Sequence, residues 1–479
     1  MDKTNVYFRA DGHPQIGVGH VIRSLALADM LKEQFSCHFI IRSPLETLTA
    51  QILETCVSII ELPDTDDDLQ EARLLSDKYL TGEEIVVLDG YHFVTAYQQV
   101  IKDKGCKLVC IDDIHTYHFV ADVVINHAGG IKPADYSVEP YTQFCLGLKY
   151  ALLRKPFREA AKHRTYPDRQ DNHVFICLGG ADPRNATLAV LKRCESIETI
   201  EKVFLVIGPA YLHKTSLRTF LEQSELDVEL LENLSAEEMV RYMKKCGLAI
   251  TPASTVAYEY LSVGGLLFLN VIADNQLSMY DFFINQHLAF DLEKLNNNYL
   301  NQIQDSSPPQ DDLNGQQEKI YTRLFQSLTL HAREAEERDT ELLFTWANDQ
   351  ATRQQSFNSK PIAFEQHKKW FLAKRSDPNS HIYILHLRQA PIAQVRFDLK
   401  DQVATLSYSI AKKYRGKGLG VPVLREAMAT LRRAYGQRLP IVGYVKKSNI
   451  ASVKVFRALD FREEETPLYE NTYKYILAW

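Results

Sequence analysis

Short apolar runs that alternate with helical patterns constrain the fold of this chain more than any other feature. Runs rich in β-branched residues occur at 6–8, 37–41, 84–88, 107–111 and 122–126. After the first run, Val21, Leu25, Ala28 and Leu31 recur at the spacing of one helix face. Continuous apolar strands separated by helices are typical of parallel sheets that are covered on both faces.

A second series of the same kind follows a charged segment at residues 154–172, which we expect to be a crossover between lobes. Its apolar runs lie at 173–178, 203–207, 248–250 and 266–269. A chain of 479 residues usually forms more than one domain. The pattern therefore predicts an α/β architecture with two Rossmann-like lobes, over residues 1–155 and 156–305.

The composition changes at residues 296–317, which are rich in Asn and then in Asp, Ser and Pro. Such a stretch indicates a boundary, so residues 306–328 are expected to form a linker or crossing helix. Helical patterns come first in the remaining residues, 329–479, followed by apolar runs, a glycine-rich turn and another helix. This order predicts a separate α+β domain.

The glycine-rich turn has the clearest chemical meaning in the C-terminal domain. Arg415-Gly416-Lys417-Gly418-Leu419-Gly420 lies between an expected strand at 406–410 and an expected helix at 423–433. Glycines at such a turn let backbone N–H groups and the helix N-terminus face a pyrophosphate. A dinucleotide fingerprint would instead lie early in a βαβ unit, so this context does not favour NAD.

The turn resembles the acetyl-CoA signature of the GNAT N-acetyltransferases, R/Q-x-x-G-x-G/A. A second block, Asn449-Ile450-Ala451-Ser452 followed by residues 455–461, is similar to the N-x-x-[SA]…Y-x-x-x-G-F helix of that family. The resemblance covers about residue 329 to the C-terminus and implies acetyl-CoA as cosubstrate. The residues implied to bind it are Ile410, Arg415, Gly416, Lys417, Gly418, Leu419, Gly420, Asn449 and Ser452.

Two positions depart from the family pattern. Phe456 stands where many members have a tyrosine that protonates the leaving thiolate, and Asp460 stands where glycine is usual. Because phenylalanine carries no proton to donate, the general acid must come from elsewhere or be dispensable. The general base is not indicated, and Tyr408 is a weak candidate for it.

Three blocks in the first 300 residues also carry candidate chemistry. The first places Gly17, Gly19 and His20 at the first strand-to-helix turn, and Ile22 breaks the GxGxxG pattern of NAD-binding lobes. The reference pKa of histidine suits proton transfer at neutral pH, although a helix-capping histidine is the plain alternative. Glycine turns of this kind also suit diphosphate contact. The second block holds Gly179, Gly180 and Asp182. The third block holds Ser254, Glu259, Asn275 and Gln276.

Together these blocks resemble the two-lobed GT-B proteins, and most closely the UDP-sugar hydrolases of pseudaminic acid biosynthesis. The matching text is FRADGHPQIGVGHVIRSLALA, VVLDGYHF, LGGADPRN, ASTVAYEYLS and ADNQ. The resemblance implies a UDP-binding second lobe and His20, Tyr91 and Asn275 as catalytic residues. It also implies substrate or UDP contacts by Gly17, Gly19, Arg23, Gly179, Gly180, Asp182, Ser254, Glu259 and Gln276.

The two resemblances imply consecutive reactions in one chain. The expected function is acetyl-CoA-dependent 4-N-acetylation of UDP-4-amino-4,6-dideoxy-N-acetyl-β-L-altrosamine, followed by hydrolytic removal of UDP from the diacetamido sugar. The alternatives are a GT-B glycosyltransferase fused to an N-acetyltransferase, and a nucleotide-sugar-binding module that has lost catalysis. The sequence does not indicate the oligomeric state.

Charge and cysteine usage limit the partners. The net charge of −6 gives no basic footprint for nucleic acid, and no polybasic or long apolar segment indicates a membrane partner. The eight cysteines, without any CxxC pair, are typical of buried thiols in a reducing compartment, so we expect a cytoplasmic protein. Residues 112–118 could suggest a metal site, but a solvated loop is commoner, and no metal is expected.

Overall fold

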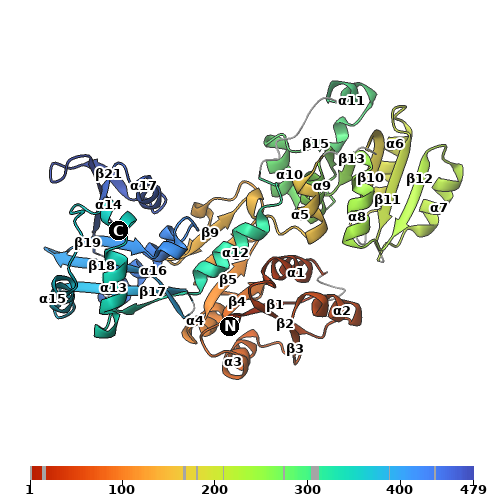
Figure 1. Ribbon diagram of the computed structural model, residues 1–479. Coiled ribbons are helices and arrows are strands. Elements are labelled where there is room, and N and C mark those ends of the chain that lie inside the picture. The colour runs from red at the N-terminus through yellow and green to blue at the C-terminus, as the bar shows by residue number, and fades with distance from the viewer. Residues whose placement is uncertain are drawn as a thin grey trace. The chain divides into compact units, whose positions relative to one another are not determined.

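The computed structural model describes residues 3–12, 18–164, 169–179, 182–208, 210–272, 276–303, 312–387, 389–435 and 439–478. The candidate residues Gly17, Gly180 and Asn275 lie outside these ranges. The chain divides into two compact units, Met1–Thr322 (unit 1) and Arg323–Trp479 (unit 2) (Figure 1). Each unit is described by itself.

The first lobe of unit 1 is a parallel sheet with strand order β3-β2-β1-β4-β5-β7-β9. The order reverses at β1, because the chain builds β2 and β3 on one side of it and returns to place β4 on the other. Phe8 of β1 lies in register between Phe39 and Val87, and all three are buried. The strands are β1 (Asn5–Ala10), β2 (Ser36–Arg42), β3 (Ser58–Leu62), β4 (Ile85–Asp89), β5 (Lys107–Ile111), β7 (Val123–Asn126) and β9 (Gln143–Leu146).

An α-helix connects each pair of successive strands from β1 to β5, as the apolar spacing predicts for parallel neighbours. A small parallel pair, β6 (His118–Phe119) and β8 (Ser137–Val138), lies outside the main sheet. The helices of this lobe are α1 (Gly19–Leu31), α2 (Glu46–Thr55), α3 (Asp68–Tyr79) and α4 (Thr95–Asp103).

The second lobe repeats the plan with strand order β12-β11-β10-β13-β14-β15, and its order reverses at β10. Its strands are β10 (Gln170–Cys177), β11 (Lys202–Ile207), β12 (Asp227–Glu232), β13 (Cys246–Thr251), β14 (Leu266–Leu269) and β15 (Phe290–Asp291). Its helices are α5 (Lys155–Lys162), α6 (Ala186–Glu195), α7 (Lys214–Gln223), α8 (Ala236–Met243), α9 (Thr255–Val263), α10 (Leu277–Asn285) and α11 (Asn297–Ile303).

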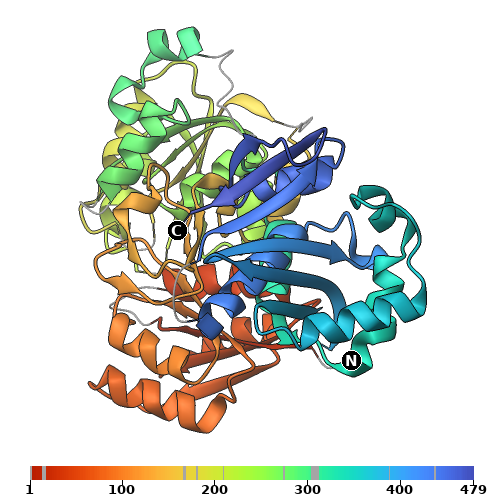
Figure 2. The same ribbon diagram turned by 90° about the vertical axis from the view of Figure 1, so that its left-hand side faces the viewer.

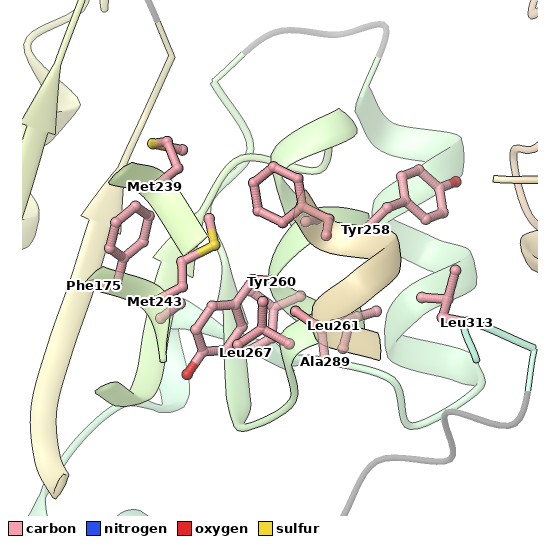
Figure 3. Packing of buried hydrophobic residues seen from close by; sticks show 14 of the residues in the cluster. Phe175, Met239, Met243, Tyr258, Tyr260, Leu261, Leu267, Ala289 and Leu313 are labelled. Carbon is pink, nitrogen blue, oxygen red and sulfur yellow. The ribbon is translucent and has the colours of Figure 1, made fainter. Parts of the chain in front are cut away.

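The segment expected to be a crossover is in part a packed helix. Phe157, Ala160 and Ala161 of α5 share one face and are buried, so the helix joins the core of the second lobe. Figure 3 shows part of that core, with Tyr258 and Tyr260 of α9 among the labelled side chains. Lys155, Glu159 and Lys162 of α5 are exposed, while Arg158 is buried beside the apolar residues, so charges flank and interrupt the apolar stripe in the sequence.

The helix α12 (Gln317–Leu328) begins in unit 1 and ends in unit 2, and its first residues return to the first lobe. Tyr321 is fully buried, and its Oη donates a hydrogen bond to the carbonyl of Tyr150 at 2.6 Å. The Thr322 hydroxyl donates to the carbonyl of Met30 at 3.3 Å. These contacts fix the chain to the first lobe after it leaves the second.

Unit 2 is a sheet with strand order β16-β17-β18-β19-β20-β22-β21, antiparallel except between β19 and β20 (Figure 2). The α/β prediction, with two Rossmann-like lobes followed by an α+β domain, is therefore confirmed. The strands are β16 (Leu330–Glu334), β17 (Ser380–Leu387), β18 (Ala390–Lys400), β19 (Val403–Ile410), β20 (Ile441–Lys446), β21 (Arg462–Glu465) and β22 (Thr472–Leu477). The helices are α13 (Thr340–Ala347), α14 (Gln350–Gln355), α15 (Phe364–Arg375), α16 (Gly420–Tyr435) and α17 (Ile450–Arg457).

The cysteines are free thiols, and all except the part-buried Cys177 are buried. Among the described residues, no helix combines the length and the hydropathy that crossing a bilayer requires.

Candidate functional site

A cluster of charged side chains lies at the carboxyl edge of the first sheet, where the strand order reverses. His20 and Arg23 lie on the first turns of α1, and Asp89 is the last residue of β4. His20 Nδ1 lies 2.7 Å from Asp89 Oδ1, and Arg23 Nε donates to the two carboxylate oxygens at 2.9 and 2.8 Å. In open parallel sheets, ligands bind at this kind of position.

Asp89 is the centre of this cluster, and its side chain has no exposed surface. Burial alone would raise the pKa of Asp89, but the charge of Arg23 and the hydrogen bonds from His20 and Arg23 outweigh it, so the pKa is lowered. The ionised carboxylate can only accept hydrogen bonds. The shorter contact with Asp89 favours the neutral tautomer that carries the proton on Nδ1, while Arg23 Nη2, which can only donate, lies 3.0 Å from the same nitrogen. In that tautomer the lone pair on Nε2 is available to a ligand.

Asp113 and Tyr91 extend the cluster toward solvent. Arg23 Nη1 donates to Asp113 Oδ2 at 2.9 Å, and Tyr91 Oη lies 3.4 Å from the same oxygen. The edge of the Tyr91 ring faces His20 at 4.9 Å between centroids, and Tyr91 is 47% exposed. The structure thus brings together His20, Arg23 and Tyr91, three of the residues for which the family resemblance implies a role.

The expectation that residues 112–118 form a solvated loop is wrong for the first residue of this segment. Asp112 is buried, and its carboxylate accepts from Tyr136 Oη and from the His115 N–H, both at 2.9 Å. Asp113 pairs with Arg23, as described above. Sequence reasoning also missed Asp89, although the VVLDGYHF block places it two residues before Tyr91. A carboxylate at the end of a buried strand was the signal that could have found it.

His127 follows β7 at the same edge of the sheet. Burial, with a smaller contribution from the charge of Arg23, lowers the pKa of His127 to about 4, so the imidazole is neutral at physiological pH. Its Nδ1 is buried and lacks a hydrogen-bond partner among the described residues. Its carbonyl accepts from Tyr258 Oη of α9 at 3.1 Å, which joins the two lobes beside the cluster.

The second lobe presents Gly179 and Ser254 at its own reversal point. Gly179 follows β10 with φ +91°, and the described residues leave open space where a Cβ would lie. Ser254 directly precedes α9, whose N-terminus carries the partial positive charge that favours phosphate. These positions suit contact with a diphosphate, as the resemblance implied.

The other UDP candidates of this lobe have partners within the protein. Glu259 is buried, and its carboxylate accepts from Arg154 Nε and Nη2 at 2.7 and 2.9 Å. Asp182 accepts from the backbone N–H groups of Ala186 and Thr187, both at 2.8 Å, at the start of α6. Gln276 Oε1 accepts from the Ile272 N–H at 3.0 Å. Each of these contacts fixes the backbone or a neighbouring side chain beside the reversal point.

The glycine turn of unit 2 has the backbone that a phosphate cradle requires. Gly416 and Gly418 have φ of +73° and +78°, with open space at their Cβ positions among the described residues. The turn ends at Gly420, where α16 begins and where a Cβ would lie 2.5 Å from Val455 Cγ2 of α17. Glycine at 420 therefore allows the two helices to approach, while Leu419 is buried in the core.

Arg415 points inward and supports the turn. Its guanidinium donates to the carbonyl of Ile410 at 2.8 Å, to Asp349 Oδ1 at 2.5 Å and to Thr352 Oγ1 at 2.9 Å. Asp349 and Thr352 belong to the N-terminal end of α14, so Arg415 holds the turn against this helix. Lys417 is left as the exposed cation of the turn.

The strands β19 and β20 separate beside this turn. Their parallel ladder runs from Ala404–Ile441 to Leu406–Gly443 and stops there within the described strands, although β19 continues to Ile410. Beyond this point the two strand ends are not paired with each other, and the place where they separate is here called the wedge. The structure thus offers acetyl-CoA a fitting site: separated strands, open glycines and a helix N-terminus.

Side chains from α17 line the same region. Asn449 is the N-cap of α17 and accepts from the Ser452 N–H at 3.2 Å, while Ser452 Oγ lies 2.9 Å from Tyr408 Oη of β19. Phe456 is buried one turn further along and stacks on Tyr475 at 4.9 Å. A Cβ on Gly443 would lie 2.4 Å from the Phe456 ring. Phe456 is thus a core residue beneath the point where the strands separate.

Comparisons with known proteins agree with this division. Residues 329–462 match the family model of the acetyltransferase (GNAT) domain. An uncharacterized protein of Methanocaldococcus jannaschii is 23% identical over 95% of this chain and 96% of its own length.

Two named relatives match the first part of the chain. The UDP-2,4-diacetamido-2,4,6-trideoxy-β-L-altropyranose hydrolase of Campylobacter jejuni is 26% identical over 53% of this chain and 87% of its own. The spore coat polysaccharide biosynthesis protein SpsG of Bacillus subtilis is 24% identical over 59% of this chain and 82% of its own. The chain therefore joins a two-lobed α/β unit, similar to these two proteins, to a C-terminal domain that matches the GNAT family model.

Proposed function

We propose that this protein carries out two consecutive steps on a nucleotide sugar: acetyl-CoA-dependent 4-N-acetylation of UDP-4-amino-4,6-dideoxy-N-acetyl-β-L-altrosamine, and hydrolytic release of UDP from the product. The observation that carries the hydrolase half is the His20–Asp89 pair at the reversal point of the first sheet, joined to Arg23. The similarity to the Campylobacter jejuni hydrolase supports the same assignment.

In the hydrolase half, His20 takes a proton from water through Nε2 as the water attacks the anomeric carbon. Asp89 stabilises the imidazolium that forms, because its buried carboxylate lies 2.7 Å from Nδ1. UDP leaves with the bonding electron pair, and the transition state has oxocarbenium character. Gly179 and the N-terminus of α9 are suited to stabilise the departing diphosphate. Tyr91, beside His20, and Asn275 are the proposed polar partners of the sugar.

In the GNAT half, Gly416, Lys417, Gly418 and the N-terminus of α16 would hold acetyl-CoA, which supplies the acetyl thioester. The neutral 4-amine of the sugar attacks the thioester carbonyl directly, the C–S bond breaks with its electron pair on sulfur, and the nitrogen loses its extra proton to water. Positioning provides much of the acceleration. Burial raises the pKa of Tyr408, more than the hydrogen bond from Ser452 lowers it. A tyrosine that retains its proton is better suited to protonate the leaving thiolate than to act as a base. Tyr408 can thus supply the proton that Phe456 lacks.

The test is mass spectrometry of reactions that contain the UDP-4-amino sugar with and without acetyl-CoA. We expect the free diacetamido sugar and UDP only when acetyl-CoA is present. His20→Ala should stop UDP release and leave acetyl transfer near normal, so that the UDP-diacetamido sugar accumulates. Equal loss of both activities in this variant would contradict separate sites. If the parent protein shows neither acetylation nor UDP release, the proposed substrate is refuted.

A further inference from the structure

Three aromatic side chains of unit 2 form an exposed cluster beside the wedge between β19 and β20, here called the aromatic platform. Phe357, in the loop after α14, stacks on Tyr469 of the β21–β22 loop at 3.9 Å between centroids and 14° between planes. The two side chains are 47% and 41% exposed. Tyr444 and Tyr469 meet in an edge-to-face arrangement with 5.6 Å between centroids. Because Tyr444 directly follows Gly443, where the ladder stops, the platform is continuous with the wedge.

Two cations hold the loop that carries Phe357. Lys446 Nζ donates to the carbonyl of Gln354 at 3.0 Å, and Arg353 Nη1 donates to the carbonyl of Lys360 at 3.2 Å. Arg353 Nε is buried without a hydrogen-bond partner in the described part of the chain.

Carboxylates of the described residues do not compensate the charges of these two side chains. Within the described ranges, neither Arg353 nor Lys446 forms an ion pair with a carboxylate, whereas nearby Arg415 pairs with Asp349 and Lys447 pairs with Glu465. The platform is therefore accompanied by positive charge that an anionic ligand could neutralise.

We propose that the aromatic platform, with Arg353 and Lys446, binds the nucleoside diphosphate of the acceptor, so that the GNAT half selects a nucleotide-linked amine. The inference rests on the proposed function and deepens it. A planar base can stack on the outer face of the Phe357–Tyr469 pair, and its phosphates can pair with the two cations. Polycationic amines have neither the base nor the negative charge, so this surface would reject them.

The first test measures CoA release by full-length protein carrying His20→Ala, so that UDP stays on the acceptor. The UDP-amino sugar is compared with the same amino sugar without UDP, and we expect kcat/KM for the latter to be lower by about a hundred-fold. Phe357→Ala and Tyr469→Ala should each raise KM for the UDP-amino sugar roughly ten-fold, as loss of base stacking does. The KM for acetyl-CoA should not change.

Matched variants separate recognition from folding. Tyr469→Phe keeps the ring and should retain a near-normal KM, and Arg353→Gln should raise KM and weaken its dependence on salt. Phe364→Ala removes a similarly exposed ring at the start of α15 and should have no effect. Equal kcat/KM for the two acceptors, with Phe357→Ala within two-fold of the parent, would overturn the inference.

A binding measurement keeps the inference separate from the proposed function. If the UDP-amino sugar is not acetylated at all, the proposed function fails. Calorimetric titration with UDP still decides the inference, because the parent chain should bind one more UDP than the Phe357→Ala/Tyr469→Ala double variant. The same stoichiometry for both proteins would refute the platform as a nucleotide site.

Discussion

Replacing Asp89 by Asn tests the central claim about unit 1, because the change keeps the shape of the side chain and removes its charge. Asp89 Oδ1 lies 2.7 Å from His20 Nδ1, and the carboxylate is fully buried. At an effective dielectric constant of about 20, a unit charge about 4 Å from the imidazolium contributes about 4 kcal/mol. Asp113 remains and offsets part of this loss, whereas the positive charge of Arg23 adds to it, so we expect kcat for UDP release to fall about 10²- to 10³-fold.

The assay is initial-rate UDP release from the UDP-diacetamido sugar, with acetyl transfer by the same preparation as the control for folding. Asp113→Asn is the matched variant, because it removes a carboxylate bound to Arg23 but leaves the His20–Asp89 contact in place, and its effect should be much smaller. In the Asp89→Asn variant, Arg23 contacts a neutral amide in place of a buried carboxylate, so unit 1 should be destabilised by about 3 kcal/mol. A rate for Asp89→Asn within two-fold of the parent would refute the role of Asp89, as would a loss of rate equal to that of Asp113→Asn.

Further predictions concern the GNAT half and the acid stability of unit 1. Gly418→Glu should abolish measurable acetyl-CoA binding, because it places bulk and negative charge in the open turn. Gly418→Ala imposes the same strained φ and should weaken acetyl-CoA binding far less. Equal affinities of the two variants for acetyl-CoA would contradict the phosphate cradle. Tyr408→Phe should lower kcat for acetyl transfer about ten- to a hundred-fold with an unchanged KM for acetyl-CoA, and an unchanged kcat would exclude Tyr408 as the proton donor. In Asp11, Glu71 and Asp89, pairing with arginines outweighs burial and lowers the pKa in the folded state. The stability that these groups contribute is present above their ordinary pKa near 4 and is lost as the pH falls through their lowered pKa values. Urea unfolding measured between pH 7 and 3 should show this decline. A free energy of unfolding that stays constant over this range would contradict the prediction.

Much of the architecture could be predicted because it depends on local patterns. Buried parallel strands are continuous apolar runs, so β4 and β5 stand out in the sequence, and the glycines of the 415–420 turn mark backbone that other residues adopt with difficulty. The helix α5 escaped prediction because its buried face is short and its charges dominate the composition of the segment. The candidate residues His20 and Tyr91 were found from their motifs, yet the motifs did not show what they contact.

The sequence by itself therefore determined the α/β lobes and the glycine turn, and it supplied the candidate residues for the chemistry. Only the tertiary structure showed that Asp89, from a strand 69 residues beyond His20, is the buried partner of that histidine. It also showed that Arg415 and Glu259, expected to contact ligands, are bound by Asp349 and Arg154. The exposed pair of Phe357 and Tyr469 is likewise invisible in the sequence. The physical reason is the same in each case, because an ion pair or a ring stack depends on the distance between segments that the fold alone brings together.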